Sequence, residues 1–238
     1  MNTQTQPKQP PLPPRPPRRD GLVFAPLAWL KLQFFLHAGA TEIGGFGISR
    51  ARDLQYIEEF RTVRQSVSAV TVEFDDQAVA DHFDRCVDDG IEPQRCGRIW
   101  IHTHPGESAQ PSHTDEQTFQ RVFGACDWSV MFIIGRTGRT YARLAFSAGP
   151  SAQMLLPVTV DWEGWPSCLA DPALDLSRLT SQWIEEYATN ITESDQARFN
   201  AFDLTDLEWW ESDPTLLGME DGFDGLDVRA ASNPGVLT

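Results

Sequence analysis

Residues 102–115 read HTHPGESAQPSHTD, and this stretch decides how the rest of the chain is interpreted. His102 and His104 lie two residues apart at the end of an apolar segment, which we expect to be a strand over 98–104. Successive side chains of a strand point to opposite faces, so both imidazoles share one face. Pro105 has no backbone N–H to donate and turns the chain away from the strand. The stretch therefore predicts two ring nitrogens side by side at a strand end.

A carboxylate follows at a spacing that suits a metal site. Asp115 lies eleven residues after His104 and begins a helix expected over 115–123, which can bring the carboxylate back to the rings. Two histidines and one carboxylate leave the fourth position of tetrahedral zinc open, as in catalytic sites. Zinc would lower the pKa of its bound water towards ~7 and polarise a carbonyl. The structural alternative, Asp115 as a helix cap or first-turn acid, does not explain why the histidines accompany it.

A metal-bound water also needs a proton acceptor, for which Glu42 is the candidate. It precedes the run Ile43-Gly44-Gly45-Phe46-Gly47, whose small residues permit the close approach of another backbone. Local spacing does not place Glu42 near the histidines, because about sixty residues separate them.

A family resemblance connects these residues. The chain resembles the JAB/MPN family of zinc metalloproteases, whose JAMM motif is a Glu, a long gap, His-x-His-Pro, six residues and Ser-x-x-Asp. The motif is present in full, at Glu42, His102, His104, Pro105, Ser112 and Asp115. The run Leu36-His37-Ala38, followed by Glu42-Ile43-Gly44-Gly45, is also similar to the family. The resemblance covers about residues 22–160.

The resemblance implies a fold and a role for each motif residue. The fold is α/β, the JAB/MPN (cytidine deaminase-like) mixed β-sheet flanked by helices. His102, His104 and Asp115 would bind one catalytic Zn²⁺ ion. Glu42 would hold the metal-bound water and shuttle its proton, and Ser112 would donate a hydrogen bond to the oxyanion of the tetrahedral intermediate.

The function implied is that of a deubiquitinase-like isopeptidase, which removes or matures a ubiquitin-like modifier. The chain is similar to bacterial peptidases of ubiquitin-like conjugation operons, so activating and conjugating enzymes are further expected partners. One alternative is a non-catalytic MPN scaffold that binds a modifier or a partner protein, against which the intact Glu42 argues. Another is a RadC-like protein associated with DNA repair. It is disfavoured because no helix–hairpin–helix module precedes Glu42 and because the charge is wrong for DNA.

Composition narrows the classes of partner. The 238 residues include 19 Lys and Arg against 34 Asp and Glu, a formal charge of −15. Such an acidic chain is a poor ligand for phosphate backbones or anionic lipid, so we expect no nucleic acid and no membrane. No apolar run is long enough to span a bilayer, and we expect a cytoplasmic protein. The four cysteines lie far apart without a Cys-x-x-Cys pair, which disfavours a cysteine zinc site or a thiol redox motif.

We expect four segments along the chain. Residues 1–21 form a Pro-rich disordered leader, and 22–160 form the metalloprotease domain. Residues 161–200 are a partly helical extension. Residues 201–238 are an acidic, mostly disordered tail, in which 204–210 is a possible docking segment because it carries Trp209 and Trp210.

Periodicity predicts the main elements of the domain and its extension. Helices are expected over 28–37, 76–86, 115–123 and 177–187. Strands are expected over 42–49, 66–74, 98–104, 129–134, 140–146 and 154–160. Of the remaining histidines, we expect His113 to be exposed or to lie beside the metal ligands without binding the ion. We expect His82 to be solvated on an Asp-rich helix, and His37 to favour a helix C-terminus.

Overall fold

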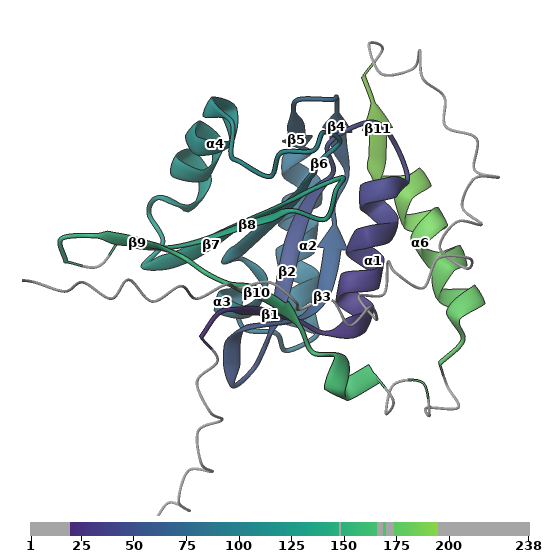
Figure 1. The fold of residues 1–238 in the computed structure, drawn as a ribbon, viewed down its shortest axis with the longest axis horizontal. Helices are drawn as coiled ribbons and strands as arrows, with labels where there is room; N and C mark the ends of the chain where they lie inside the picture. The colour runs from purple at the N-terminus through teal and green to yellow at the C-terminus, as the bar shows by residue number, and fades with distance from the viewer. Residues whose placement is uncertain (1–19, 148, 166–168, 170–173, 195–238) are drawn as a thin grey trace, which may run out of the picture. The chain divides into compact units, whose positions relative to one another are not determined.

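A computed structural model describes residues 20–147, 149–165, 169 and 174–194 (Figure 1). The described helices and strands are, in chain order, β1 (Leu22–Phe24), α1 (Pro26–His37), β2 (Gly44–Arg50), β3 (Asp53–Thr62), β4 (Gln65–Val67), β5 (Val72–Phe74), α2 (Asp76–Asp88), α3 (Pro93–Cys96), β6 (Ile99–His104), α4 (His113–Phe123), β7 (Trp128–Gly135), β8 (Thr140–Phe146), β9 (Ala152–Leu155), β10 (Val158–Val160), η1 (Trp162–Gly164), α6 (Leu176–Asn190) and β11 (Ile191–Glu193). The fold is α/β, as the sequence predicts.

The larger sheet has eight strands in the order β10-β1-β3-β2-β6-β7-β8-β9. Strand β6 lies inside this sheet, antiparallel to β2 on one side and parallel to β7 on the other. The sheet is therefore mixed, and the strand that ends in the two histidines is held along both edges.

The two faces of this sheet are covered by different helices. On β6, Ile99 and Ile101 pack in the same core cluster as the buried face of α1, whereas Trp100 packs with Phe119 and Phe123 of α4. Strand β7 alternates in the same way, and both of its faces are buried, which explains its continuous apolar sequence. Because His102 and His104 follow Trp100 at a period of two, they lie on the α4 face.

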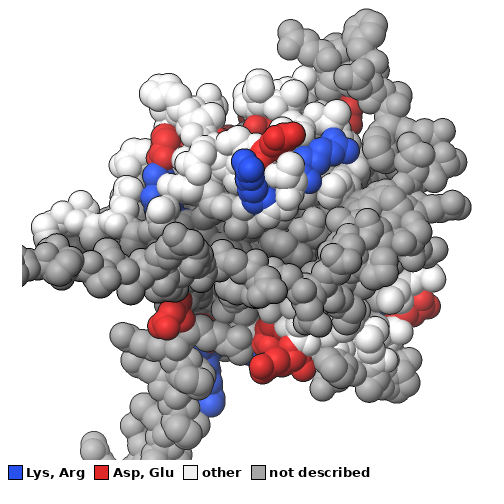
Figure 2. All heavy atoms as spheres, in the orientation of Figure 1, with Lys and Arg blue, Asp and Glu red and all other residues white. Residues whose placement is uncertain are grey.

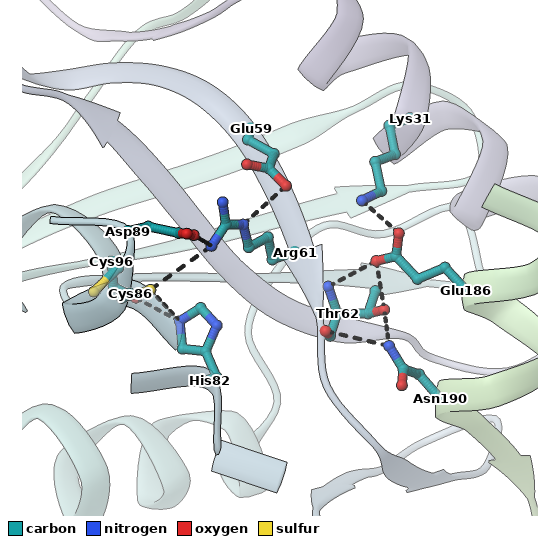
Figure 3. A network of polar contacts seen from close by, with 10 residues as sticks. All are labelled: Lys31, Glu59, Arg61, Thr62, His82, Cys86, Asp89, Cys96, Glu186 and Asn190. Atoms are coloured by element: carbon teal, nitrogen blue, oxygen red, sulfur yellow. Dashed lines mark hydrogen bonds and ion pairs between the residues drawn. The ribbon is translucent and has the colours of Figure 1, made fainter. Parts of the chain in front are cut away.

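A smaller sheet joins the C-terminal part of the described chain to the domain. Its order is β11-β4-β5, and β11 runs parallel to β4. Helix α6 packs beside α1, where Lys31 Nζ lies 2.6 Å from the Glu186 carboxylate (Figure 3). The same carboxylate accepts hydrogen bonds from the backbone N–H and the hydroxyl of Thr62. The extension after the large sheet therefore contributes a strand and a helix to the folded unit.

Most of the expected elements are present, and the errors have identifiable causes. The helices expected over 28–37, 76–86, 115–123 and 177–187 correspond to α1, α2, α4 and α6. The single strands expected over 66–74 and 154–160 are wrong, because each is two short strands, β4 with β5 and β9 with β10. In the first case alternation continues across a turn closed by the N–H of Ser68 on the carbonyl of Thr71.

Five described elements had no sequence prediction, namely β1, β3, α3, η1 and β11. Strand β3 was missed because Glu58, Glu59 and Arg61 interrupt its apolar pattern. Residues 1–19 of the expected leader, the whole 201–238 tail and its 204–210 segment lie outside the described residues. No described helix is long and apolar enough to cross a membrane. On the face that Figure 2 shows, described basic side chains lie beside acidic ones.

Candidate metal centre

Contacts with neighbouring residues hold the two histidines of β6 in place. His102 is fully buried, and its ring stacks on Trp100, with centroids 4.3 Å apart. His104 is 12% exposed, and its Nδ1 lies 2.9 Å from the carbonyl oxygen of Ser108 in the following loop. A carbonyl oxygen only accepts, so Nδ1 carries the proton and Nε2 presents its lone pair. A hydrogen bond of this kind commonly orients a metal-binding imidazole.

Asp115 is placed by the way α4 begins. Ser112 is the N-cap residue, and its hydroxyl oxygen accepts from the Asp115 N–H at 3.1 Å. The Asp115 carboxylate accepts in return from the Ser112 N–H at 2.6 Å, which completes a capping box. Glu116 makes two hydrogen bonds to Arg143 of β8, at 2.6 and 2.7 Å, which tie the first turn to the sheet. Asp115 is therefore a first-turn acid and also faces the histidines.

Glu42 reaches the histidines through strand pairing between distant segments. Strand β2 pairs with β6 so that Gly44 is opposite His102. The N–H of Ile43 donates to the hydroxyl of Thr103 at 3.0 Å, and the N–H of Thr103 donates to the Ile43 carbonyl at 2.9 Å. The backbone of Glu42 donates to the Ser68 carbonyl. These contacts supply the connection that spacing in the sequence lacks.

Small residues in β2 make this pairing possible. A Cβ atom at Gly45 would collide with the carbonyl of Arg61 on β3, so a backbone does approach closely there. Beside it, the Gln65 side chain bonds to both the N–H and the carbonyl of Gly44, at 2.7 and 2.8 Å. Thr103 and Gln65 were not among the residues chosen from the sequence. The sequence gives little signal for either, since each is a polar residue within a short strand.

The structure thus brings four predicted side chains together. The ligand atoms of His102, His104 and Asp115 all lie within 4.8 Å of one another. His102 Nε2 is 3.3 Å and His104 Nε2 is 3.5 Å from the Asp115 carboxylate. Glu42 Oε1 lies 3.6 Å from His104 Nε2, too far for a direct hydrogen bond. Glu42 therefore stands beside the trio rather than within it.

The polar atoms of this site fit a bound metal ion. Among the described residues, both ring nitrogens of His102 and Nε2 of His104 are buried without a hydrogen-bond partner. Leaving a buried polar group unpaired costs ~1–3 kcal/mol, so such groups call for an explanation. Asp115 is close to both rings, but its alignment does not meet the requirements of a hydrogen bond. Two imidazoles and a carboxylate with converging free lone pairs suit zinc.

The burial of the site shifts the pKa of each group in a useful direction. Burial lowers the pKa of His102, which keeps its imidazole neutral. Burial opposes ionisation of Asp115, but its contacts with the two rings and the Ser112 N–H hold its pKa far below the usual range. Burial raises the pKa of Glu42 to about 7, with His104 opposing this shift and Asp115 adding to it. The site therefore offers one ionised carboxylate and one that exchanges its proton near neutral pH.

A groove of about 850 Å³ lies on the face of the larger sheet that α4 covers. Its walls are β5 with the end of β4 on one side and α4 on the other, and Trp100 and Thr114 bring it next to the histidines. Strand β5 is an edge strand, since among described elements it pairs with β4 alone. An extended chain could add to such an edge by backbone hydrogen bonding.

The other three histidines differ in outcome. His37 is the last residue of α1, at a helix C-terminus as expected. His113 is exposed, as expected. The expectation that His82 is solvated is wrong, since only 1% of it is exposed. Its neighbours Asp81 and Asp84 face solvent or are partly exposed, but the His82 ring stacks on Phe46 of β2 with centroids 4.6 Å apart. The charged residues in the sequence of a helix therefore do not show whether one of its faces is buried.

Comparison with known proteins gives one match. A family model described as prokaryotic homologs of the JAB domain matches residues 36–147. This range includes Glu42, both histidines of β6, Ser112 and Asp115. No curated protein matches the chain.

Proposed function

Because residues 36–147 form a JAB domain, we propose that this protein is a zinc-dependent isopeptidase that acts on a ubiquitin-like modifier or its conjugates. The observation that carries the proposal is the convergence of His102, His104 and Asp115, with Glu42 standing beside them. The fold alone does not set the activity, so the argument rests on the chemistry of these groups.

In this proposal His102, His104 and Asp115 hold the ion. They fit it because their unpaired lone pairs converge, and because one of the three ligands is anionic. Bound there, zinc supplies a Lewis acid that polarises an amide carbonyl and acidifies water. The Ser108 carbonyl keeps His104 in the tautomer that leaves Nε2 free.

Glu42 is the proposed general base and acid. Its carboxylate lies 3.6 Å from His104 Nε2, which is close to the site without occupying a ligand position. From this position it can accept a proton from water and return it to the leaving amine. The pairing of Ile43 with Thr103 keeps this carboxylate in place.

Ser112 is the proposed donor to the developing oxyanion. Its hydroxyl oxygen accepts from the Asp115 N–H, so its own proton remains available for donation. Ser112 is also exposed, which leaves it accessible to a substrate carbonyl. A donor placed at an oxyanion typically contributes ~100- to 1,000-fold in rate.

The groove beside the site supports a protein substrate with an extended tail. It adjoins the histidines at Trp100 and Thr114 and is bounded by the edge strand β5. We propose that the C-terminal tail of the modifier lies along this edge, with its final amide at the zinc ligands. The modifier would be removed from a target or trimmed from a precursor by the same hydrolysis.

The test is cleavage of linear fusions between candidate ubiquitin-like modifiers and a reporter protein, read by mass spectrometry. We expect the zinc-loaded protein to cut one fusion after the modifier's last residue, and chelation followed by zinc addition to abolish and restore cleavage. The matched control is His104→Ala, which should lose zinc and cleavage together. A fully zinc-loaded protein that cleaves no modifier fusion and no modifier conjugate contradicts the proposal.

A further inference from the structure

A second cluster of metal-binding side chains lies outside the JAMM residues. It consists of His82 and Cys86 on α2 and Cys96 at the end of α3, and we call it the α2–α3 cluster (Figure 3). His82 and Cys86 are four residues apart, one helical turn, so they face the same direction. Cys96 comes from the next helix along the chain. The ligand atoms of the three residues all lie within 4.8 Å of one another.

The distances suit a tetrahedral ion. His82 Nε2 and Cys86 Sγ are 3.8 Å apart. Zinc bonds of ~2.3 Å to sulfur and ~2.05 Å to nitrogen place two tetrahedral ligands about 3.6 Å apart. The cluster therefore needs only a small contraction to bind an ion. In this structure the same nitrogen donates to the backbone carbonyl of Cys96 at 3.1 Å, so an ion bound at Nε2 would replace this hydrogen bond.

All three residues of the α2–α3 cluster are buried. His82 is 1% exposed, Cys86 0% and Cys96 1%. The His82 ring is fixed between Phe46, on which it stacks, and Phe83, which it meets edge-on. Solvent therefore has little access to the three ligand atoms, as is usual for a structural rather than a catalytic ion.

The charges around the α2–α3 cluster also favour a cation with two thiolates. A divalent ion, two thiolates and a neutral imidazole sum to zero charge. Arg61 Nη1 lies 3.8 Å from Cys86 Sγ, in a position to donate to a thiolate. Arg61 does not repel the ion strongly, because Glu59 at 2.9 Å and Asp89 at 3.8 Å pair with it.

We propose that His82, Cys86 and Cys96 bind a structural zinc ion, separate from the ion of the JAMM residues. Spacing in the sequence hides this site because the two cysteines are ten residues apart and come from different helices. A nucleophilic or redox-active thiol is the weaker reading. Such cysteines are exposed, whereas Cys86 and Cys96 are both buried.

The ion would hold α2 and α3 together against the larger sheet, near the candidate active site. His82 stacks on Phe46, and Phe46 is paired across the strands with Trp100, the residue that stacks on His102. The α2–α3 cluster therefore supports the strand pair that carries the candidate active site. The proposal does not depend on peptidase activity.

The test is metal content together with the absorption spectrum of the full chain. We expect about two zinc ions per wild-type chain, and about one in either Cys86→Ala or His104→Ala. Cobalt in place of zinc distinguishes the sites, because only the α2–α3 cluster supplies thiolates. The wild-type cobalt form should show a thiolate-to-cobalt charge-transfer band, which His104→Ala retains and Cys86→Ala loses.

The matched control is Cys126→Ala, since Cys126 is a partly buried cysteine outside the α2–α3 cluster. It should keep both the zinc content and the band. The wild-type spectrum tests the proposal even where a variant fails to fold. A wild-type cobalt form without the band contradicts the site, as does a band that survives in Cys86→Ala. A disulfide between Cys86 and Cys96 in the purified protein contradicts it equally.

Discussion

Replacing Thr103 by Val tests how the structure positions Glu42. Thr103 is not among the motif residues, but its hydroxyl accepts the N–H of Ile43 at 3.0 Å, and both residues are buried. Valine keeps the shape and removes the acceptor, so the Ile43 N–H is left unpaired. We expect the free energy of unfolding to fall by ~1–3 kcal/mol. We also expect Glu42 to shift, and a displacement of ~1 Å can cost about 100-fold in rate.

The assay for this variant combines three measurements. Urea unfolding gives the loss of stability, elemental analysis gives the zinc content, and cleavage of a modifier fusion gives the rate. Zinc should be retained, because the Thr103 hydroxyl bonds to the backbone of Ile43 and is not itself a proposed ligand. Thr103→Ser is the matched control and should keep most of the stability and rate. Wild-type stability and rate in Thr103→Val would refute the reasoning that this hydrogen bond holds Glu42.

Three further variants test other contacts of the site and the fold. Ser112→Ala should retain zinc, lose ~0.5–2 kcal/mol of stability through the missing cap in urea unfolding, and lose ~100- to 1,000-fold in cleavage rate. Unchanged values of both would contradict its two roles. Gln65→Leu should lower the free energy of unfolding by ~1–3 kcal/mol, because it removes the side-chain partner of the N–H and carbonyl of Gly44. Wild-type stability of this variant would contradict that role. Burial, helped by Arg136, lowers the pKa of His37 to about 4, so its contribution to stability is complete above ~6.5 and is lost as pH falls towards 4. His37→Gln should flatten the pH dependence of unfolding in that window, and an unchanged slope would count against it.

The parts of the site that depend on local geometry were predictable. The shared face of His102 and His104 follows from the period of a strand, and the place of Asp115 follows from where a helix can begin after Pro111. The position of Glu42 was not predictable from spacing, because it depends on the pairing of β2 with β6, which joins segments sixty residues apart. The resemblance to a known motif supplied that link.

The errors arose where tertiary contacts override local pattern. His82 lies on a helix with several acids, yet it is buried, because one face of α2 packs on Phe46. Strand β3 carries charged residues within its apolar pattern, yet it is central in the sheet. For His82 the deciding partner, Phe46, comes from a distant part of the chain.

The most direct test of the central claim is the cleavage rate of Glu42→Gln at matched zinc content. Glutamine preserves the size of the side chain but cannot exchange a proton, and Glu42 lies beside the three proposed ligands rather than among them. We therefore predict that the variant keeps zinc and its fold and loses ~100- to 10,000-fold in the rate of modifier cleavage. A zinc-loaded Glu42→Gln protein that cleaves at the wild-type rate would contradict the account.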